Sequence, residues 1–119
     1  TPRDALQAVF RVHVEFVVAH PGVPRLIFHE LQQPAESAAK LEVRAVMQGY
    51  RKLLLGVLSR ALAQGQLGAD VDPEAAATGF IGLIQGLVMQ SMLTGRTAAM
   101  RRQAEPVFAL YLRGIGATP

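Results

Sequence analysis

The sequence has no cysteine and no tryptophan, and only 18% of its 119 residues are charged. Without cysteine, the chain can form no disulfide, thiolate nucleophile or zinc site with cysteine ligands, which is compatible with a reducing cytoplasm. Half of the residues are hydrophobic, which excludes a disordered chain, and aliphatic side chains must supply most of the core. A chain of this length suits one domain with a real core and is too short for two.

The positive charge is spread along the chain. The formal net charge is +3, yet the twelve lysines and arginines are scattered, and the adjacent basic pairs are Arg51-Lys52 and Arg101-Arg102. No basic stripe of the kind that contacts phosphates is apparent. We therefore expect no direct binding of nucleic acid by these residues.

Motifs for catalysis and for metal binding are also missing. No serine stands in a nucleophile motif, no glycine-rich loop follows a strand, and no carboxylate pair stands out. His13, His20 and His29, together with Glu15 and Glu30, have spacings that match no established metal motif. The sequence predicts no enzyme, no metal site and no cofactor.

Apolar residues recur every three or four positions, and no segment alternates as a strand would. This periodicity predicts an all-α fold, a bundle of about five helices in one domain covering residues 1–119. Prolines and glycines set the approximate bounds of the helices: Pro2 to His20, Pro24 to Gln32, Ala35 to Gln64, Pro73 to Thr94, and Thr97 to Ile115.

Several of these boundaries carry capping signals. Thr1 precedes a proline at the first helical position and can cap the first helix. Asp72-Pro73-Glu74 combines an N-cap, a first-turn proline and a first-turn carboxylate, while Gly65 fits a C-terminal cap. Pro106 lies inside the last helix and predicts a kink or a restart near residue 105.

The segment "ATGFIGLIQGLVMQSMLTG", residues 77–95, contains no charged residue, so either lipid or protein must cover it. Its length and its GxxxG frame are compatible with a membrane-spanning helix. However, it contains Gln85 and Gln90, it follows an N-cap typical of soluble helices, and the other predicted helices are amphipathic. We therefore expect the central helix of a soluble protein and no membrane contact.

At about 100° per residue, one stripe of this helix holds Gly79, Leu83, Gly86, Gln90 and Leu93. Small residues in a stripe allow another helix backbone to approach closely, and four other helices would struggle to cover the whole circumference. The pattern predicts that this stripe meets a second subunit. The alternative is that the glycines accommodate a neighbouring helix of the same chain.

The segments "HPGVPRLIFHELQQP" and "GQLGADVDPEAAATGFIGLIQGLVMQSMLTG", followed by a final helix ending in "YLRGI", carry a resemblance that covers nearly the whole chain. The sequence resembles the C-terminal regulatory domain of the TetR/AcrR family of bacterial transcription regulators. The resemblance implies a cytoplasmic ligand-sensing and dimerisation domain, in which the last two helices of each subunit form an intersubunit four-helix bundle.

Regulators of this family bind DNA through an N-terminal helix-turn-helix domain. The first predicted helix already fits the regulatory domain, and nothing in this sequence supplies the three helices of the DNA-binding domain. We expect that domain to lie outside this chain, so that DNA is a partner of the full-length regulator alone.

The resemblance implies an effector pocket among the first four helices, and the chain offers apolar residues with a few polar groups of the kind that line such pockets. The candidate ligand-binding residues are Phe10, His13, Val17, Phe28, Met47, Tyr50, Leu54, Ile84, Gln85 and Met89. The candidate dimer interface consists of Gly79, Leu83, Gly86, Gln90, Leu93, Val107, Tyr111 and Gly114.

His13 lies on an otherwise apolar face, where it is either a hydrogen-bonded core residue or a ligand contact. Tyr50 and Gln85 present the same two alternatives. The predicted function is that of a homodimeric regulator domain that binds a small apolar or amphipathic effector and thereby changes the DNA affinity of the helix-turn-helix domain. The alternative functions are a helical protein-interaction module without a small-molecule ligand and a membrane-associated helical protein.

Overall fold

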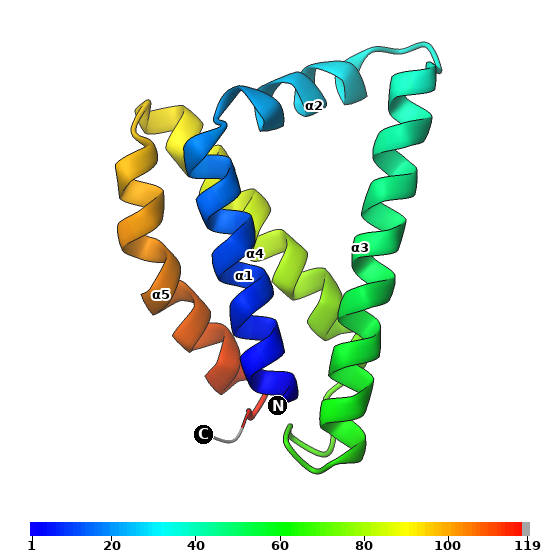
Figure 1. Ribbon diagram of the computed structural model, residues 1–119, viewed down its shortest axis with the longest axis vertical. Coiled ribbons are helices and arrows are strands. Elements are labelled where there is room, and N and C mark those ends of the chain that lie inside the picture. Colours follow the sequence, from blue (N-terminus) through cyan, green and yellow to red (C-terminus); the bar gives the residue numbers. More distant parts are fainter. Residues whose placement is uncertain (118–119) are drawn as a thin grey trace.

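Five helices make up most of the part of the chain that the computed structural model describes, residues 1–117, and these residues contain no strand. The fold class predicted from the sequence is therefore confirmed. The helices, drawn in Figure 1, are α1 (Pro2–Ala19), α2 (Gly22–Gln32), α3 (Ala38–Ala63), α4 (Pro73–Thr94) and α5 (Thr97–Gly114).

The predicted caps are present at both ends of helices. The Thr1 hydroxyl accepts a hydrogen bond from the Asp4 amide at 3.2 Å, and the Asp72 carboxylate accepts one from the Glu74 amide at 3.0 Å. At the end of α3, Gly65 has a φ of +70°, which favours glycine, and its amide donates to the Leu62 carbonyl at 3.1 Å. Local hydrogen bonding thus fixes these boundaries as the sequence predicted.

Two boundaries differ from the prediction because of local hydrogen bonds and prolines. The third helix begins at Ala38 instead of Ala35, because the Ser37 hydroxyl caps it by accepting from the Lys40 amide at 3.0 Å. The second helix begins at Gly22, before Pro24, since a proline is tolerated within a first turn.

The predicted restart near residue 105 is wrong, because α5 runs without interruption through Pro106. A proline in a helix removes the hydrogen bond to the carbonyl four residues earlier, which is that of Arg102. Both residues are exposed, so water can satisfy this carbonyl.

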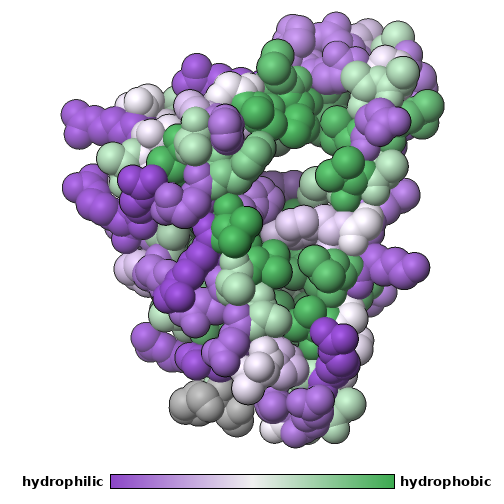
Figure 2. Space-filling model, viewed as in Figure 1, coloured by the Kyte–Doolittle hydropathy of each residue, from purple (hydrophilic) through white to green (hydrophobic). Residues whose placement is uncertain are grey.

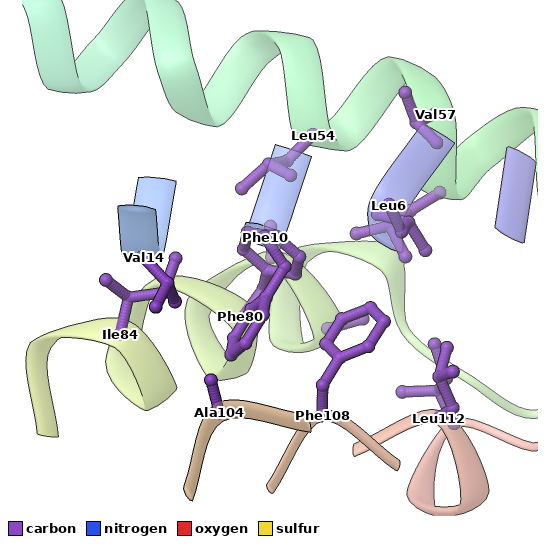
Figure 3. Close-up of a cluster of buried hydrophobic side chains, with 14 of the residues drawn as sticks. Leu6, Phe10, Val14, Leu54, Val57, Phe80, Ile84, Ala104, Phe108 and Leu112 are labelled. Atoms are coloured by element: carbon purple, nitrogen blue, oxygen red, sulfur yellow. The ribbon is translucent and has the colours of Figure 1, made fainter. Parts of the chain in front are cut away.

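The core lies where α1, α4 and α5 meet, with α3 closing the other side. α4 runs diagonally behind α1, and α5 and α3 flank this pair (Figure 1). Phe10 of α1, Phe80 of α4 and Phe108 of α5 point toward one another at the centre (Figure 3), with Phe80 5.7 Å from Phe10 and 6.1 Å from Phe108 between ring centroids. Both contacts of Phe80 are edge-to-face, a favourable geometry for aromatic rings.

α2 differs from the other helices in that none of its residues is buried. It crosses from the end of α1 to the start of α3 and closes the wide end of a triangle (Figure 1). Its C-terminal end is attached to α3 by polar contacts: the Ser37 hydroxyl donates to the Glu30 carboxylate at 2.6 Å, and the Lys40 ammonium donates to the Gln33 carbonyl. α2 is therefore attached to α3 at its C-terminal end, and it reaches the core through Phe28.

Two reciprocal ion pairs connect α1 to α5. Arg11 binds Glu105 with an N–O distance of 2.6 Å, and Arg101 binds Glu15 at 2.9 Å. The hydrogen bond from Arg11 lowers the pKa of the Glu105 carboxyl. All four side chains are more than half exposed, so solvent screens both pairs and they contribute little to stability.

The end of α5 packs against the loop between α3 and α4 through two glycines. Gly116 has a φ of +67°, and a Cβ atom at this position would lie 2.8 Å from the backbone nitrogen of Gly68. The Gly68 amide in turn donates to the Ile115 carbonyl at 3.0 Å. Only a residue without a side chain allows this close approach of the two backbones.

We expect Gly116→Ala to destabilise the domain more than Gly65→Ala, which serves as its matched control. Both positions have a positive φ, which costs alanine about 1–2 kcal/mol, but nothing lies within 4 Å of a Cβ at Gly65. The clash with Gly68 should add about 1–3 kcal/mol. Urea denaturation of the two variants measures the difference, and equal losses would show that the loop moves away freely.

Candidate functional site

A cavity of about 150 Å³ lies beneath α2 and is enclosed by α1, α3 and α4. Figure 2 shows the hollow below α2, with hydrophobic side chains around it. Phe28 is the residue of α2 that packs against the core, and the apolar side of α2 forms the roof of the cavity. The residues that line it are His13, Phe16, Val17, Val23, Pro24, Ile27, Phe28, Leu31, Val43, Met47, Ile81, Ile84, Gln85 and Val88.

A second, more open hollow of about 460 Å³ adjoins this cavity along α1 and α3. His13 and Phe16 line both hollows, so the two hollows lie next to each other at these side chains. The remaining lining residues are Ala8, Val9, Val12 and Tyr50. The resemblance implies an effector pocket among these helices, so we call the two hollows together the effector groove. Its inner part lies beneath α2, and its outer part is open to solvent.

A hydrogen bond between His13 and Tyr50 joins α1 to α3 where the two parts of the groove meet. The distance from His13 Nδ1 to the Tyr50 hydroxyl is 2.9 Å, and both side chains are half-buried. Burial lowers the pKa of His13 and raises the pKa of Tyr50 to about 12. Both groups are therefore uncharged near neutral pH, and Nε2 is the atom through which His13 can bind a ligand.

The side of α4 that faces away from α1 is apolar and open. Leu93 is 79% exposed, and a Cβ atom at Gly82 or Gly86 would have nothing within 4 Å. Gly79 lies against the ring of Tyr111, whose hydroxyl donates to the Ala76 carbonyl at 2.6 Å. No charged residue occurs on α4 after Glu74, so this surface is uncharged over almost its whole length.

Comparison with known proteins places this architecture in a family. A family profile described as "Tetracyclin repressor-like, C-terminal domain" matches residues 32–107, which is more than half of the chain. The chain belongs to this family. No curated protein and no solved structure matches it. Domains of the family are, in general, non-enzymatic domains of regulators that bind small effectors and dimerise.

Seven of the ten ligand-binding candidates of this TetR-family domain lie in the effector groove. Tyr50 lines the outer part, His13 lines both parts, and the inner part also contains Val17, Phe28, Met47, Ile84 and Gln85. Phe10 and Leu54 are instead buried in the core, and Met89 is 48% exposed on α4. These three residues do not line the groove.

The sequence did not indicate how strongly α2 contributes to the groove. Val23, Ile27 and Leu31 line its inner part and are spaced four residues apart, which places them on one side of a helix. This spacing could have identified them as lining residues. The sequence alone does not show that these three residues face a cavity, because α2 is short and its sequence does not indicate which helix its apolar side faces.

The eight residues predicted for the dimer interface are all at least partly exposed in the single chain. They occupy the open side of α4 and the adjacent part of α5: Gly79, Leu83, Gly86, Gln90, Leu93, Val107, Tyr111 and Gly114. Their contact with a second subunit stays a prediction, but their placement leaves them available for one.

α4 is long and apolar enough to cross a membrane, and it is the helix within residues 1–117 that meets this criterion. The central helix of a soluble protein meets the same criterion, and one side of α4 is buried against the rest of the chain through Phe80, Ile84 and Leu87.

Within residues 1–117, no three His, Cys, Asp or Glu side chains come together in a group that could hold a metal ion.

The lowered pKa of His13 predicts a pH dependence of stability. Burial favours the neutral imidazole in the folded state, so His13 stabilises the fold fully above its unfolded pKa of about 6.5, and this contribution is lost as the pH falls. Between about pH 8 and pH 5, the wild type should therefore lose more unfolding free energy than His13→Gln, which does not titrate. Urea denaturation across this range tests the difference; parallel profiles would contradict it.

Proposed function

We propose that this chain is the effector-binding and dimerisation domain of a cytoplasmic, bacterial TetR-family transcription regulator. The observation that carries the proposal is the effector groove, which lies in a domain of a family whose members generally bind small effectors. DNA would be bound by a helix-turn-helix domain in another part of the protein.

In this proposal a small apolar or amphipathic molecule occupies the groove beneath α2. The wall is almost entirely apolar, with His13, Gln85 and Tyr50 as its polar members. Such a composition is typical of small-molecule sites, in which a few polar groups orient the ligand. His13 is then both satisfied within the fold, by Tyr50, and available to a ligand, so that the two alternatives for this residue are compatible.

The proposed dimer forms when α4 and α5 of two subunits pack into a four-helix bundle. The uncharged, open side of α4 supports this arrangement, because soluble proteins rarely leave a large apolar patch exposed. Gly86 would allow close approach of the partner helix, and Leu93 would become buried.

Signal transmission would use α1 as the connection between ligand and dimer. α1 contributes His13, Phe16 and Val17 to the groove, and its other side is joined to α5 by the ion pairs of Arg11 and Glu15. A ligand that binds one position of α1 more tightly would shift α5 and so favour one arrangement of the dimer. The ligand can change the equilibrium between the two dimer arrangements only by the difference between its binding free energies for them.

Native mass spectrometry of the purified chain tests the proposal. The expected spectrum shows a dimer that retains a small molecule or takes one up from a library of apolar and amphipathic compounds. A monomeric chain would contradict the dimer. A dimer that takes up no compound would instead support a protein-interaction module.

A further inference from the structure

The effector groove contains no charged side chain in either part. Of the fourteen residues that line the inner part, twelve are apolar, and the other two are His13 and Gln85. The outer part adds only the Tyr50 hydroxyl to the polar groups. A charged ligand group in the inner part, or bound to the half-buried His13–Tyr50 pair, would lose hydration without meeting an opposite charge, which is unfavourable.

The arginines nearest to the groove along α3 are already engaged elsewhere. Arg44 and Arg51 line a separate shallow hollow on the other side of Met47 and Ile81. Arg44 forms an ion pair with Glu36, with an N–O distance of 2.6 Å, and Arg51 forms one with Glu74 at an N–O distance of 2.9 Å. A ligand carboxylate would have to break one of these pairs in order to gain a cation.

The His13–Tyr50 pair offers a neutral ligand one donor and one acceptor. If the Tyr50 hydroxyl donates to Nδ1, the Nε2–H group of His13 is a donor; in the other tautomer, Nε2 accepts and the Tyr50 O–H group can donate. The lowered pKa of His13 is consistent with an uncharged imidazole in this position. A hydroxyl group, which both donates and accepts, can bind either tautomer.

The volume of the groove indicates how the ligand lies. The inner part, at about 150 Å³, is smaller than the 300–1,000 Å³ typical of ligand pockets, whereas the outer part adds about 460 Å³. A molecule of ordinary size is too large for the inner part alone and would have to reach past His13 into the outer part. Its apolar portion fills the inner part, and its polar group lies at the junction.

Resting on the proposed effector-binding function, we infer that the ligand is an uncharged, elongated molecule whose apolar chain lies beneath α2 and whose hydroxyl-type group binds the His13–Tyr50 pair. Carboxylates and amines with the same chain are poor ligands.

Three probes with one eight-carbon chain test this inference: 1-octanol, octanoate and octylamine. Calorimetric titration of the purified chain near neutral pH should show that 1-octanol binds at least tenfold more tightly than either charged probe. A tenfold preference corresponds to about 1.4 kcal/mol, less than the desolvation of an unpaired charge can cost.

Variants of the polar pair identify the binding group. Tyr50→Phe and His13→Leu should each weaken 1-octanol binding by roughly two- to tenfold, the effect of one lost hydrogen bond. His29→Leu replaces an exposed histidine on α2 that does not line the groove, and it should bind as the wild type does. Tyr50→Phe removes a single oxygen atom, so it remains informative if His13→Leu does not fold.

The outcomes separate this inference from the proposed function. Octanoate or octylamine binding as tightly as 1-octanol, or 1-octanol binding unchanged by Tyr50→Phe and His13→Leu, would overturn the inference and leave effector binding intact. Failure of all three probes to bind would also overturn the inference, whereas effector binding itself is tested by native mass spectrometry with the compound library.

Discussion

Replacing Gly86 with leucine is expected to weaken the proposed dimer strongly while each subunit stays folded. Within one chain a Cβ atom at Gly86 would meet nothing within 4 Å, so the larger side chain has room in the subunit. Leucine also favours the helical conformation over glycine by about 1 kcal/mol. In the proposed bundle, however, the same side chain would enter the contact between two α4 helices, where overpacking costs about 1–3 kcal/mol per site.

Because the substitution occurs in both subunits, the dimer should lose about 2–6 kcal/mol, which weakens association by roughly 30-fold or more. Sedimentation or light scattering over a dilution series measures this effect, and circular dichroism verifies that the helices persist. Gly56→Leu is the matched control: Gly56 is an exposed glycine within α3 that also has nothing within 4 Å of a Cβ. A Gly86→Leu protein that remains a dimer of full strength would remove Gly86 from the interface.

Phe80→Ala is expected to cost about 3–5 kcal/mol of unfolding free energy, the range found for large-to-small changes of buried aromatic residues. Phe80 of α4 is completely buried and contacts aromatic rings from three other helices. Its ring centroid lies 5.7 Å from that of Phe10 in α1, 6.5 Å from that of Tyr50 in α3 and 6.1 Å from that of Phe108 in α5. Its removal leaves a void at the point where these helices meet, and the surrounding helices can close this void only partly. Many domains have a total stability of only 5–15 kcal/mol, so this change alone threatens folding.

Phe16→Ala is the control for Phe80→Ala, because Phe16 is the same residue type in α1 but is 49% exposed and lines the effector groove. Its replacement should cost clearly less, since fewer contacts are lost. Denaturation by urea compares the two variants directly. Equal losses would mean that the aromatic cluster of Figure 3 does not dominate the stability of the fold.

The helices were predictable because their signals are local. The Thr1 and Asp72 caps each act over two or three residues, and the structure contains both. The errors are also local in origin. Ser37 could have been recognised as an N-cap, but the helical pattern continued upstream of it. Pro106 predicted a kink or a restart of α5; the helix does not restart there, because the exposed carbonyl of Arg102 can be hydrated.

The candidate ligand residues were predictable only in part. Periodicity identified the apolar sides of α1 and α3, but it assigned Phe10 and Leu54 to the groove together with their neighbours His13 and Tyr50. These pairs are separated by about one turn of a helix, and whether a turn faces core or cavity depends on where the other helices cross. Met89 was misplaced for the same reason, since α4 is apolar on every side and its periodicity is weak.

The sequence by itself determined that the chain is helical, where most of its helices begin and end, and which family it resembles, because caps, prolines and apolar spacing act between residues close in the chain. Only the tertiary structure decided that α2 buries none of its residues and leaves a groove beneath it, that His13 meets Tyr50, and that one side of α4 packs on Phe10 and Phe108 while another stays open. These features depend on the angles and positions at which helices distant in sequence cross, and no hydrogen bond within a single helix specifies them.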